Sequence, residues 1–286
     1  MEPIKIAAPA KLNLTLDVLG KREDGYHEMK MVMQSVSLAD ELTLEIQPGE
    51  GVALSSNLGF LPLDGRNLAA AAAMQFREAT GVNYGRLTIC LTKKVPVCAG
   101  MAGGSSDAAA VLRGLNQLLG TGLSPQELAK IGERVGSDVP YCVLGGTALA
   151  QGRGEQVTPL PALPGCWTVL AKPEFSVSTP ELFARLDGQR LRCHPDTAGM
   201  IAALETKDLQ GVARRLFNIF EQVLPERKRG KVEELKQLLL HCGALGASMS
   251  GTGPTVFGLF DDEGTAQAAE AEAKTFCREV FLARTL

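Results

Sequence analysis

The stretch Pro96-Val97-Cys98-Ala99-Gly100-Met101-Ala102-Gly103-Gly104-Ser105-Ser106 decides the fold of this chain. Small residues fill nearly every position, and a segment of helical composition, Ser105 to Leu119, follows. A glycine-rich turn lets backbone N–H groups approach a ligand without obstruction by side chains. The next helix points its positive dipole end and its free N–H groups back into the turn. We therefore expect these residues, called the glycine loop below, to cradle a di- or triphosphate.

A plainer alternative is a tight strand-to-helix turn that Ser105 or Ser106 caps. The absence of charged residues from Val95 to Ser106 favours anion binding over this alternative. The stretch is no Walker loop, because G-x-x-x-x-G-K-[ST] occurs nowhere in the chain, and its glycines are not spaced as in the dinucleotide fingerprint. The motifs of serine hydrolases, zinc proteases and protein kinases are absent as well.

Periodicity around the loop predicts an α+β protein. In the strand from Lys11 to Leu19, leucines and a valine alternate with Lys11, Asn13, Thr15 and Asp17, which share a polar face. Further strands are expected at Lys30–Leu38, Glu41–Ile46, Arg86–Thr92, Val143–Ala150, Trp167–Ala171, Gly246–Ser250, Thr255–Phe260 and Val280–Arg284. Helices are expected at Asn67–Thr80, from Ser124 to near Gly136, from Thr179, and at Asp208–Val223, Lys231–His241 and Gly264–Phe276. The proline-rich stretch Gln156 to Gly165 suggests two domains, 1–157 and 158–286.

The composition is that of a globular protein. Of 286 residues, 45% are hydrophobic and 21% are charged, which excludes wholesale disorder. The net charge of −3 argues against a general nucleic-acid binder. No secretory signal or membrane span is recognisable, so no membrane partner is expected. The seven cysteines form no C-x-x-C pair, and none of the three histidines has ligand spacing to a cysteine, so we expect reduced thiols, no zinc site and a cytoplasmic protein.

Three segments together resemble one family of small-molecule kinases. They are Ala8 to Leu16 with Gly25-Tyr26-His27, the glycine loop with its helix, and Gly246-Ala247-Ser248-Met249-Ser250-Gly251-Thr252-Gly253-Pro254. Their order and spacing are similar to the galactokinase, homoserine kinase, mevalonate kinase and phosphomevalonate kinase (GHMP) family. The resemblance implies a two-lobed α+β fold with the active site in the cleft between lobes, and ATP with Mg²⁺ as the phosphoryl donor. Cys98 and Ala102 stand where many members have glycine.

The same resemblance implies the catalytic pair. Lys11 matches the family's active-site lysine, and Asp138, in Gly136-Ser137-Asp138-Val139-Pro140, matches its aspartate base. A carboxylate in reach of an alcohol can take the proton that the alcohol loses as it attacks phosphorus. By local pattern alone, Asp138 would cap a turn and Lys11 would face water at a strand edge. Asp107, near the start of the helix, fits a helix-dipole partner, and the metal ligands stay unassigned.

The segment P-A-K-L-N-L followed by D-G-Y-H resembles the members whose acceptor is a cytidine-diphosphate-linked methylerythritol, phosphorylated on its 2-hydroxyl. In this interpretation Tyr26 stacks on cytosine, His27 meets the polar edge of the base, Phe183 supplies a second stacking face, and Asn13 also binds the substrate. The alternatives are a related kinase with another acceptor, such as homoserine or mevalonate, and a non-catalytic nucleotide-binding regulator. A base-stacking tyrosine disfavours the first, and the retention of Lys11 and Asp138 disfavours the second.

Overall fold

The computed structural model describes residues 2–189, 191 and 193–286, which form two compact units. Unit 1 comprises residues 1–10, 39–97 and 102–145, and unit 2 comprises residues 11–38, 98–101 and 146–286. The units are thus discontinuous in sequence, whereas the division into 1–157 and 158–286 expected above is consecutive. The reason is that strands β1 (Ile4–Lys21) and β2 (His27–Gln47) each contribute residues to both units.

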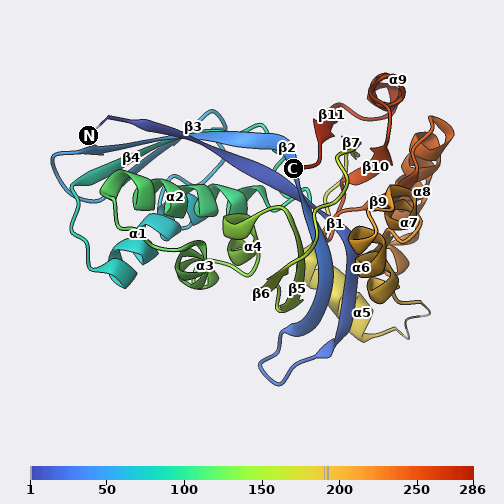
Figure 1. Cartoon of the computed structure of the whole chain (residues 1–286), viewed down its shortest axis with the longest axis horizontal. Coiled ribbons are helices and arrows are strands. Elements are labelled where there is room, and N and C mark those ends of the chain that lie inside the picture. Colours follow the sequence, from blue (N-terminus) through green and yellow to red (C-terminus); the bar gives the residue numbers. More distant parts are fainter. Residues whose placement is uncertain (1, 190, 192) are drawn as a thin grey trace. The chain divides into compact units, whose positions relative to one another are not determined.

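Unit 1 is a strand layer covered by helices. Beside its parts of β1 and β2 it contains β3 (Val52–Ser56), β4 (Arg86–Thr92), α1 (Leu68–Thr80), α2 (Gly103–Leu119), α3 (Pro125–Glu133) and α4 (Val139–Leu144). The strand order is β3-β4-β2-β1, with β2 antiparallel and β3 parallel to β4. Helices α1 and α2 lie on one face of these strands (Figure 1). A Cβ at Gly114 of α2 would overlap the side chains of Ile6 and Leu44, so glycine permits this close approach.

The helix ends of unit 1 follow the sequence signals. Asn67 caps α1 by accepting a hydrogen bond from the Ala69 N–H at 3.0 Å, and Gly81 ends the helix in the left-handed conformation. Ser124 and Glu127 form a capping box at the start of α3, where the sequence predicts a helix start. Helix α2 begins at Gly103, two residues before the expected start at Ser105, so the last residues of the glycine loop are themselves helical.

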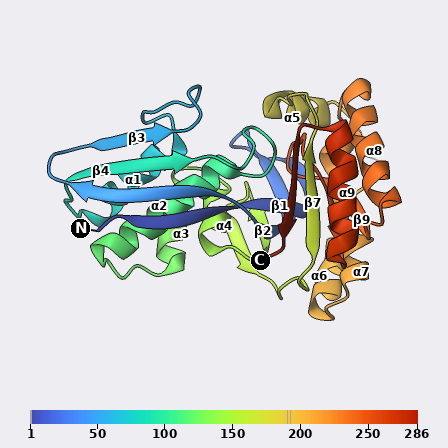
Figure 2. The ribbon, with the colours of Figure 1, turned by 90° about the horizontal axis from the view of Figure 1, so that it is seen from above.

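Unit 2 contains the antiparallel sheet β11-β7-β10-β9. Its strands are β7 (Trp167–Lys172), β9 (Gly246–Met249), β10 (Val256–Phe260) and β11 (Glu279–Arg284). Helices α8 (Glu226–His241) and α9 (Glu263–Phe276) cover one face of this sheet (Figure 2). The other elements of unit 2 are β5 (Thr147–Gly152), β6 (Gln156–Pro159), β8 (Phe217–Asn218), α5 (Thr179–Asp187), α6 (Thr197–Glu205), α7 (Leu209–Ala213) and the 3₁₀ helix η1 (Ile219–Gln222). Strand β2 pairs with β5, β5 with β6, and β1 with β8.

Several expectations about single elements were wrong. The segment Asp208–Val223 is not one helix, since α7, β8 and η1 share it and Asn218 pairs in parallel with Leu16 of β1. The segment Val143–Ala150 ends α4 and begins β5, because Gly145 and Gly146 break the chain between them with positive φ. The strands expected on either side of Ala39 are one continuous strand, β2. Among the described residues, no helix has the length and apolar character needed to cross a bilayer.

Candidate functional site

The glycine loop turns through left-handed backbone conformations. Gly100 has φ of 76°, and Cys98 and Ala102 both have φ of 53°. Glycine adopts this region without steric cost, whereas other L-residues do so at about 1–2 kcal/mol. Cys98 and Ala102 therefore adopt this turn at some cost in backbone strain, and both have small side chains.

The start of α2 offers backbone donors at the end of the glycine loop. Its N-cap residue, Ala102, provides no side-chain hydrogen bond, so the first-turn N–H groups receive no side-chain cap. Gly104 is exposed and Ser105 half-buried, whereas the buried Ser106 donates its hydroxyl to the Pro9 carbonyl at 2.6 Å. Ser106 thus anchors the loop to β1. The uncapped N–H groups at Gly103 to Ser105 fit the phosphates of a nucleotide.

Within unit 2, residues 98–101 of the glycine loop pack against the third glycine-rich segment. The Ser250 hydroxyl donates to the Gly100 carbonyl at 2.9 Å, and the Lys11 N–H donates to the Met101 carbonyl at 3.1 Å. A Cβ at Gly100 would overlap the Ser250 carbonyl oxygen, and one at Gly251 would lie 2.7 Å from the Gly100 carbonyl oxygen. Glycine is therefore required on both segments for the backbones to approach this closely.

Lys11 is 4% exposed, so the alternative of a lysine facing water at a strand edge is wrong. Its ammonium donates to Asn13 Oδ1 at 2.6 Å, and the same oxygen accepts the Gly251 N–H at 2.9 Å. Asn13 is fully buried and also donates to Met31 Sδ at 3.4 Å. The polar strand face predicted from Lys11 and Asn13 exists, but it lies in the interior, and Asn13 orients the lysine.

Asp138 belongs to unit 1 and is half-buried at the N-cap position of α4. Its side chain makes no capping hydrogen bond, while its carbonyl accepts the Cys142 N–H at 3.0 Å. The backbone of Asp138 thus starts the helix, and the carboxylate is not used as a cap. Lys11 belongs to unit 2, so the pairing of Asp138 with Lys11 stays a prediction.

Three of the residues predicted to bind the acceptor lie together in unit 2. The rings of His27 and Phe183 stack with centroids 4.4 Å apart, and Phe183 meets Phe220 edge-on at 5.0 Å. His27 Nε2 lies 2.7 Å from Asp187 Oδ1, a contact that lowers the pKa of the Asp187 carboxyl. Tyr26 is more than half exposed, at 55%, with the Arg153 guanidinium 5.1 Å from its ring centre. An exposed aromatic ring can stack on a base, and this role of Tyr26 stays a prediction.

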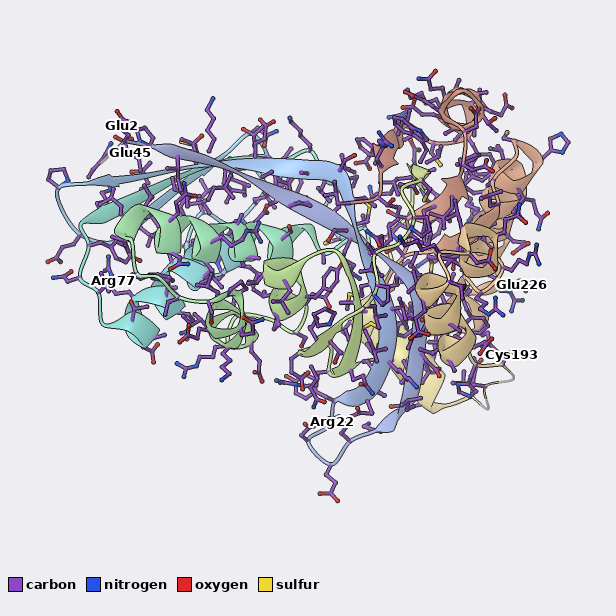
Figure 3. The ribbon with its side chains drawn as sticks, viewed as in Figure 1. Glu2, Arg22, Glu45, Arg77, Cys193 and Glu226 are labelled. Atoms are coloured by element: carbon purple, nitrogen blue, oxygen red, sulfur yellow. The ribbon has the colours of Figure 1, made fainter. Side chains whose placement is uncertain are left out.

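The loop that carries Tyr26 is held by charged side chains. It joins β1 to β2 and contains Arg22 (Figure 3). The Tyr26 N–H donates to Asp24 Oδ1 at 3.0 Å, which lowers the pKa of the Asp24 carboxyl, and Arg22 pairs with Glu28 at 2.6 Å. These bonds fix the backbone that presents the tyrosine ring.

Sequence reasoning did not find the buried group Asp40, Lys93 and Asp107 in unit 1. Lys93 Nζ donates to Asp40 Oδ2 and, at 2.8 Å, to Asp107 Oδ2. Lys93 precedes the glycine loop and Asp107 follows it, but Asp40 is 53 residues from Lys93, and no local pattern connects them. Asp107 is thus more than a helix-dipole partner.

Among residues 2–189, 191 and 193–286, no group of three or more His, Cys, Asp or Glu side chains is arranged to hold a metal. Mg²⁺ is usually held by substrate phosphates with one or two carboxylates.

Known proteins resemble this chain over nearly its whole length. Residues 67–146 match the GHMP kinases N terminal domain, and residues 200–279 match the GHMP kinases C terminal. A 4-diphosphocytidyl-2-C-methyl-D-erythritol kinase of Geobacillus kaustophilus (strain HTA426) is 47% identical over 99% of this chain and 97% of its own length. The same-named protein of Listeria welshimeri serovar 6b is 47% identical over 98% of this chain and 96% of its own.

Solved structures extend the likeness to the fold. The crystal structure of a 4-(cytidine 5'-diphospho)-2C-methyl-D-erythritol kinase superposes with a TM-score of 0.83 at 32% identity, covering 99% of each chain. A homoserine kinase from Cytophaga hutchinsonii superposes with a TM-score of 0.78 at 23% identity, covering 100% of this chain and 95% of its own. The second likeness concerns the fold alone.

Proposed function

Because the chain belongs to the GHMP kinases, in the family of the 4-diphosphocytidyl-2-C-methyl-D-erythritol kinases, we propose that it transfers the γ-phosphoryl group of ATP to the 2-hydroxyl of 4-diphosphocytidyl-2-C-methyl-D-erythritol. The observation that carries this proposal is the 47% identity over 99% of the chain with a kinase of that name. The reaction serves isoprenoid precursor synthesis by the non-mevalonate route.

The glycine loop binds the phosphates of ATP. Support comes from the left-handed turn at Gly100 and the uncapped N–H groups at the start of α2, which suit an anion. In this assignment the backbone of the loop, Pro96 to Ser106, holds the nucleotide, while the Ser106 hydroxyl anchors the loop. A Mg²⁺ ion held by the phosphates of the nucleotide would neutralise part of their charge.

Asp138 accepts the proton of the 2-hydroxyl as its oxygen forms a bond to the γ-phosphorus. The bond between that phosphorus and the oxygen bridging to the β-phosphate breaks, and ADP leaves. The half-buried carboxylate without a capping role supports Asp138 as the base. Lys11, oriented by Asn13, stabilises the negative charge that develops on the transferred group.

The acceptor's cytosine stacks on Tyr26, and His27 meets its polar edge. Phe183, predicted as a second stacking face for the base, packs one face of its ring on His27. The bond between His27 and Asp187 supports this assignment, since it fixes which imidazole nitrogen faces away from the carboxylate. All seven cysteines are free thiols, which supports placing the enzyme in the cytoplasm.

A coupled assay of ATP turnover with three acceptors tests the function. Turnover with 4-diphosphocytidyl-2-C-methyl-D-erythritol should far exceed turnover with mevalonate or homoserine, because neither of these carries a base for Tyr26. Preference for mevalonate or homoserine would assign another acceptor, and no turnover with any of them would favour a non-catalytic nucleotide-binding protein.

A further inference from the structure

Three charged side chains of unit 1 are almost completely removed from water. The side chains of Asp40, Lys93 and Asp107 are 0%, 4% and 4% exposed. Burying charge is costly unless each group is paired and hydrogen-bonded. Asp40 and Lys93 meet this condition, because both are paired and hydrogen-bonded. The groups that they bind lie on the two sides of the glycine loop.

Asp40 holds the entrance to the loop. Its Oδ1 accepts the backbone N–H groups of Lys94 at 2.6 Å and Val95 at 2.8 Å, and its Oδ2 accepts from the Lys93 ammonium. Asn57 holds the same segment from another side, since its Oδ1 accepts the Lys93 N–H at 2.8 Å. Pro96, the first residue of the loop, follows directly, so the chain enters the loop from a fixed position.

Lys93 connects this entrance to the other end of the loop. Its ammonium donates to Asp107 Oδ2 at 2.8 Å and lies 3.1 Å from the position that a Cβ on Gly103 would take. The ammonium therefore rests against the first residue of α2 and is bonded to a side chain one turn further along. One buried cation thus contacts both ends of the loop.

We propose that Asp40, Lys93 and Asp107 form a clamp that fixes both ends of the glycine loop before ATP binds, so that all three are positioning residues for the nucleotide. This inference rests on the proposed role of the loop in binding phosphates. A loop that is ordered in advance binds its ligand more tightly, because less conformational entropy is lost on binding.

The carboxyl of Asp107 also links the clamp to the binding of a proton. Burial raises the pKa of Asp107 to about 7, Lys93 opposes this rise and Asp40 adds to it. Lys93, directly after β4, and Asp40, from β2, are the charged groups that act on this carboxyl among the described residues. Asp107 Oδ1 is buried with no partner in the described part of the chain. Phosphate charge at the start of α2 disfavours a second anion nearby, so ATP binding should be coupled to protonation of Asp107.

Four variants test the clamp and the loop assignment on which it rests. Asp107→Ala, which removes the bond to Lys93, should raise the KM for ATP by about tenfold, the effect of losing roughly one ordered contact. The KM for the acceptor and kcat should stay within about twofold, since the loop serves the nucleotide. Leu115→Ala is the matched control: it removes a fully buried side chain from the same helix and should lower the thermal midpoint without changing the KM for ATP.

Asp107→Asn keeps the shape of the side chain and its acceptor oxygen, so it should restore the KM for ATP. It should also abolish the extra proton uptake on ATP binding, which titration calorimetry in buffers of different ionisation enthalpy measures near pH 7. The clamp would be refuted if Asp107→Ala left the KM for ATP within twofold of the parent, if Leu115→Ala raised it equally, or if Asp107→Asn took up the same proton.

Gly103→Val distinguishes failure of the clamp from failure of the loop assignment. If Gly103→Val binds ATP with unchanged affinity, the loop does not bind the phosphates and the assignment itself is overturned. If Gly103→Val weakens ATP binding but Asp107→Ala leaves the KM for ATP unchanged, only the clamp is overturned.

Discussion

Replacing Gly100 by alanine should disturb the contact between the glycine loop and the third glycine-rich segment. The backbone at Gly100 has φ of 76°, which costs an L-residue about 1–2 kcal/mol. The added Cβ would also overlap the Ser250 carbonyl oxygen and lie 3.0 Å from the Gly253 nitrogen. Both neighbours are backbone atoms, so rotation of a side chain cannot relieve the overlap.

The expected loss in the free energy of unfolding is the sum of the backbone strain and one broken hydrogen bond. Movement of the loop away from Ser250 breaks the hydrogen bond from its hydroxyl to the Gly100 carbonyl, which contributes about 1 kcal/mol. Added to the backbone strain, this gives a loss of about 2–3 kcal/mol in the free energy of unfolding. In a protein of this size we expect the thermal midpoint to fall by roughly 5–10 °C.

Differential scanning calorimetry and the KM for ATP measure the two consequences. The matched control is Ala102→Gly, which places glycine at a left-handed position of the same loop and should not lower the midpoint. The reasoning fails if Gly100→Ala unfolds within about 2 °C of the parent protein, because that shift corresponds to less than the backbone strain alone. A normal KM for ATP in the destabilised variant would show that the nucleotide does not use this part of the loop.

Three further outcomes are expected. Asp138→Asn should lower turnover by about 10²–10⁴-fold at saturating substrates, with both affinities and the thermal midpoint unchanged, because it removes only the base; turnover within a few-fold of the parent would remove Asp138 from the mechanism. Tyr26→Ala should weaken acceptor binding by about 1–3 kcal/mol, the contribution of stacking on a base, without changing the KM for ATP; equal weakening for both substrates would contradict the cytosine pocket. In the folded protein the pKa of Asp107 is about 7, above its ordinary 3.8, so between these values the folded state retains a proton that the unfolded chain releases. The free energy of unfolding should therefore fall as the pH rises from 3.8 to 7, by up to about 1.4 kcal/mol per pH unit. Denaturant unfolding of Asp107→Asn from pH 4 to pH 7 should lack this component, and parallel pH profiles for variant and parent would exclude it.

Local signals in the sequence determined the elements whose ends are chemically marked. Strand β4 spans Arg86–Thr92, the range that its alternation predicts. Helix α1 ends at the predicted Thr80, with Asn67 and Gly81 as its caps, and α3 follows its cap Ser124, where a helix start is predicted. Each of these signals acts within one turn or one strand, so it is independent of tertiary contacts. The three motifs also predicted the kinase family, to which the chain belongs.

Tertiary structure decided the features that depend on partners distant in the chain. The segment from Asp208 to Val223 has helical periodicity, but Asn218 donates to the carbonyls of Met249 and Gly251 and pairs with β1, contacts that outweigh local helix propensity. The polar face of β1 was predicted to exist, whereas its burial could not be, because periodicity gives a face and not what covers it.

The same limit applies to the buried charges. Lys93 stands in the sequence as one of two adjacent lysines at the end of a strand, a position that is ordinarily solvated. Only the fold brings Asp40 from β2 and Asp107 from α2 to its ammonium, and the burial that raises the pKa of Asp107 exists only once these elements have assembled. Residue types and spacing thus determined which groups could bind a nucleotide. Packing between distant segments determined which of them are held in place, because the free energy of a buried charge depends on its surroundings and not on its sequence neighbours.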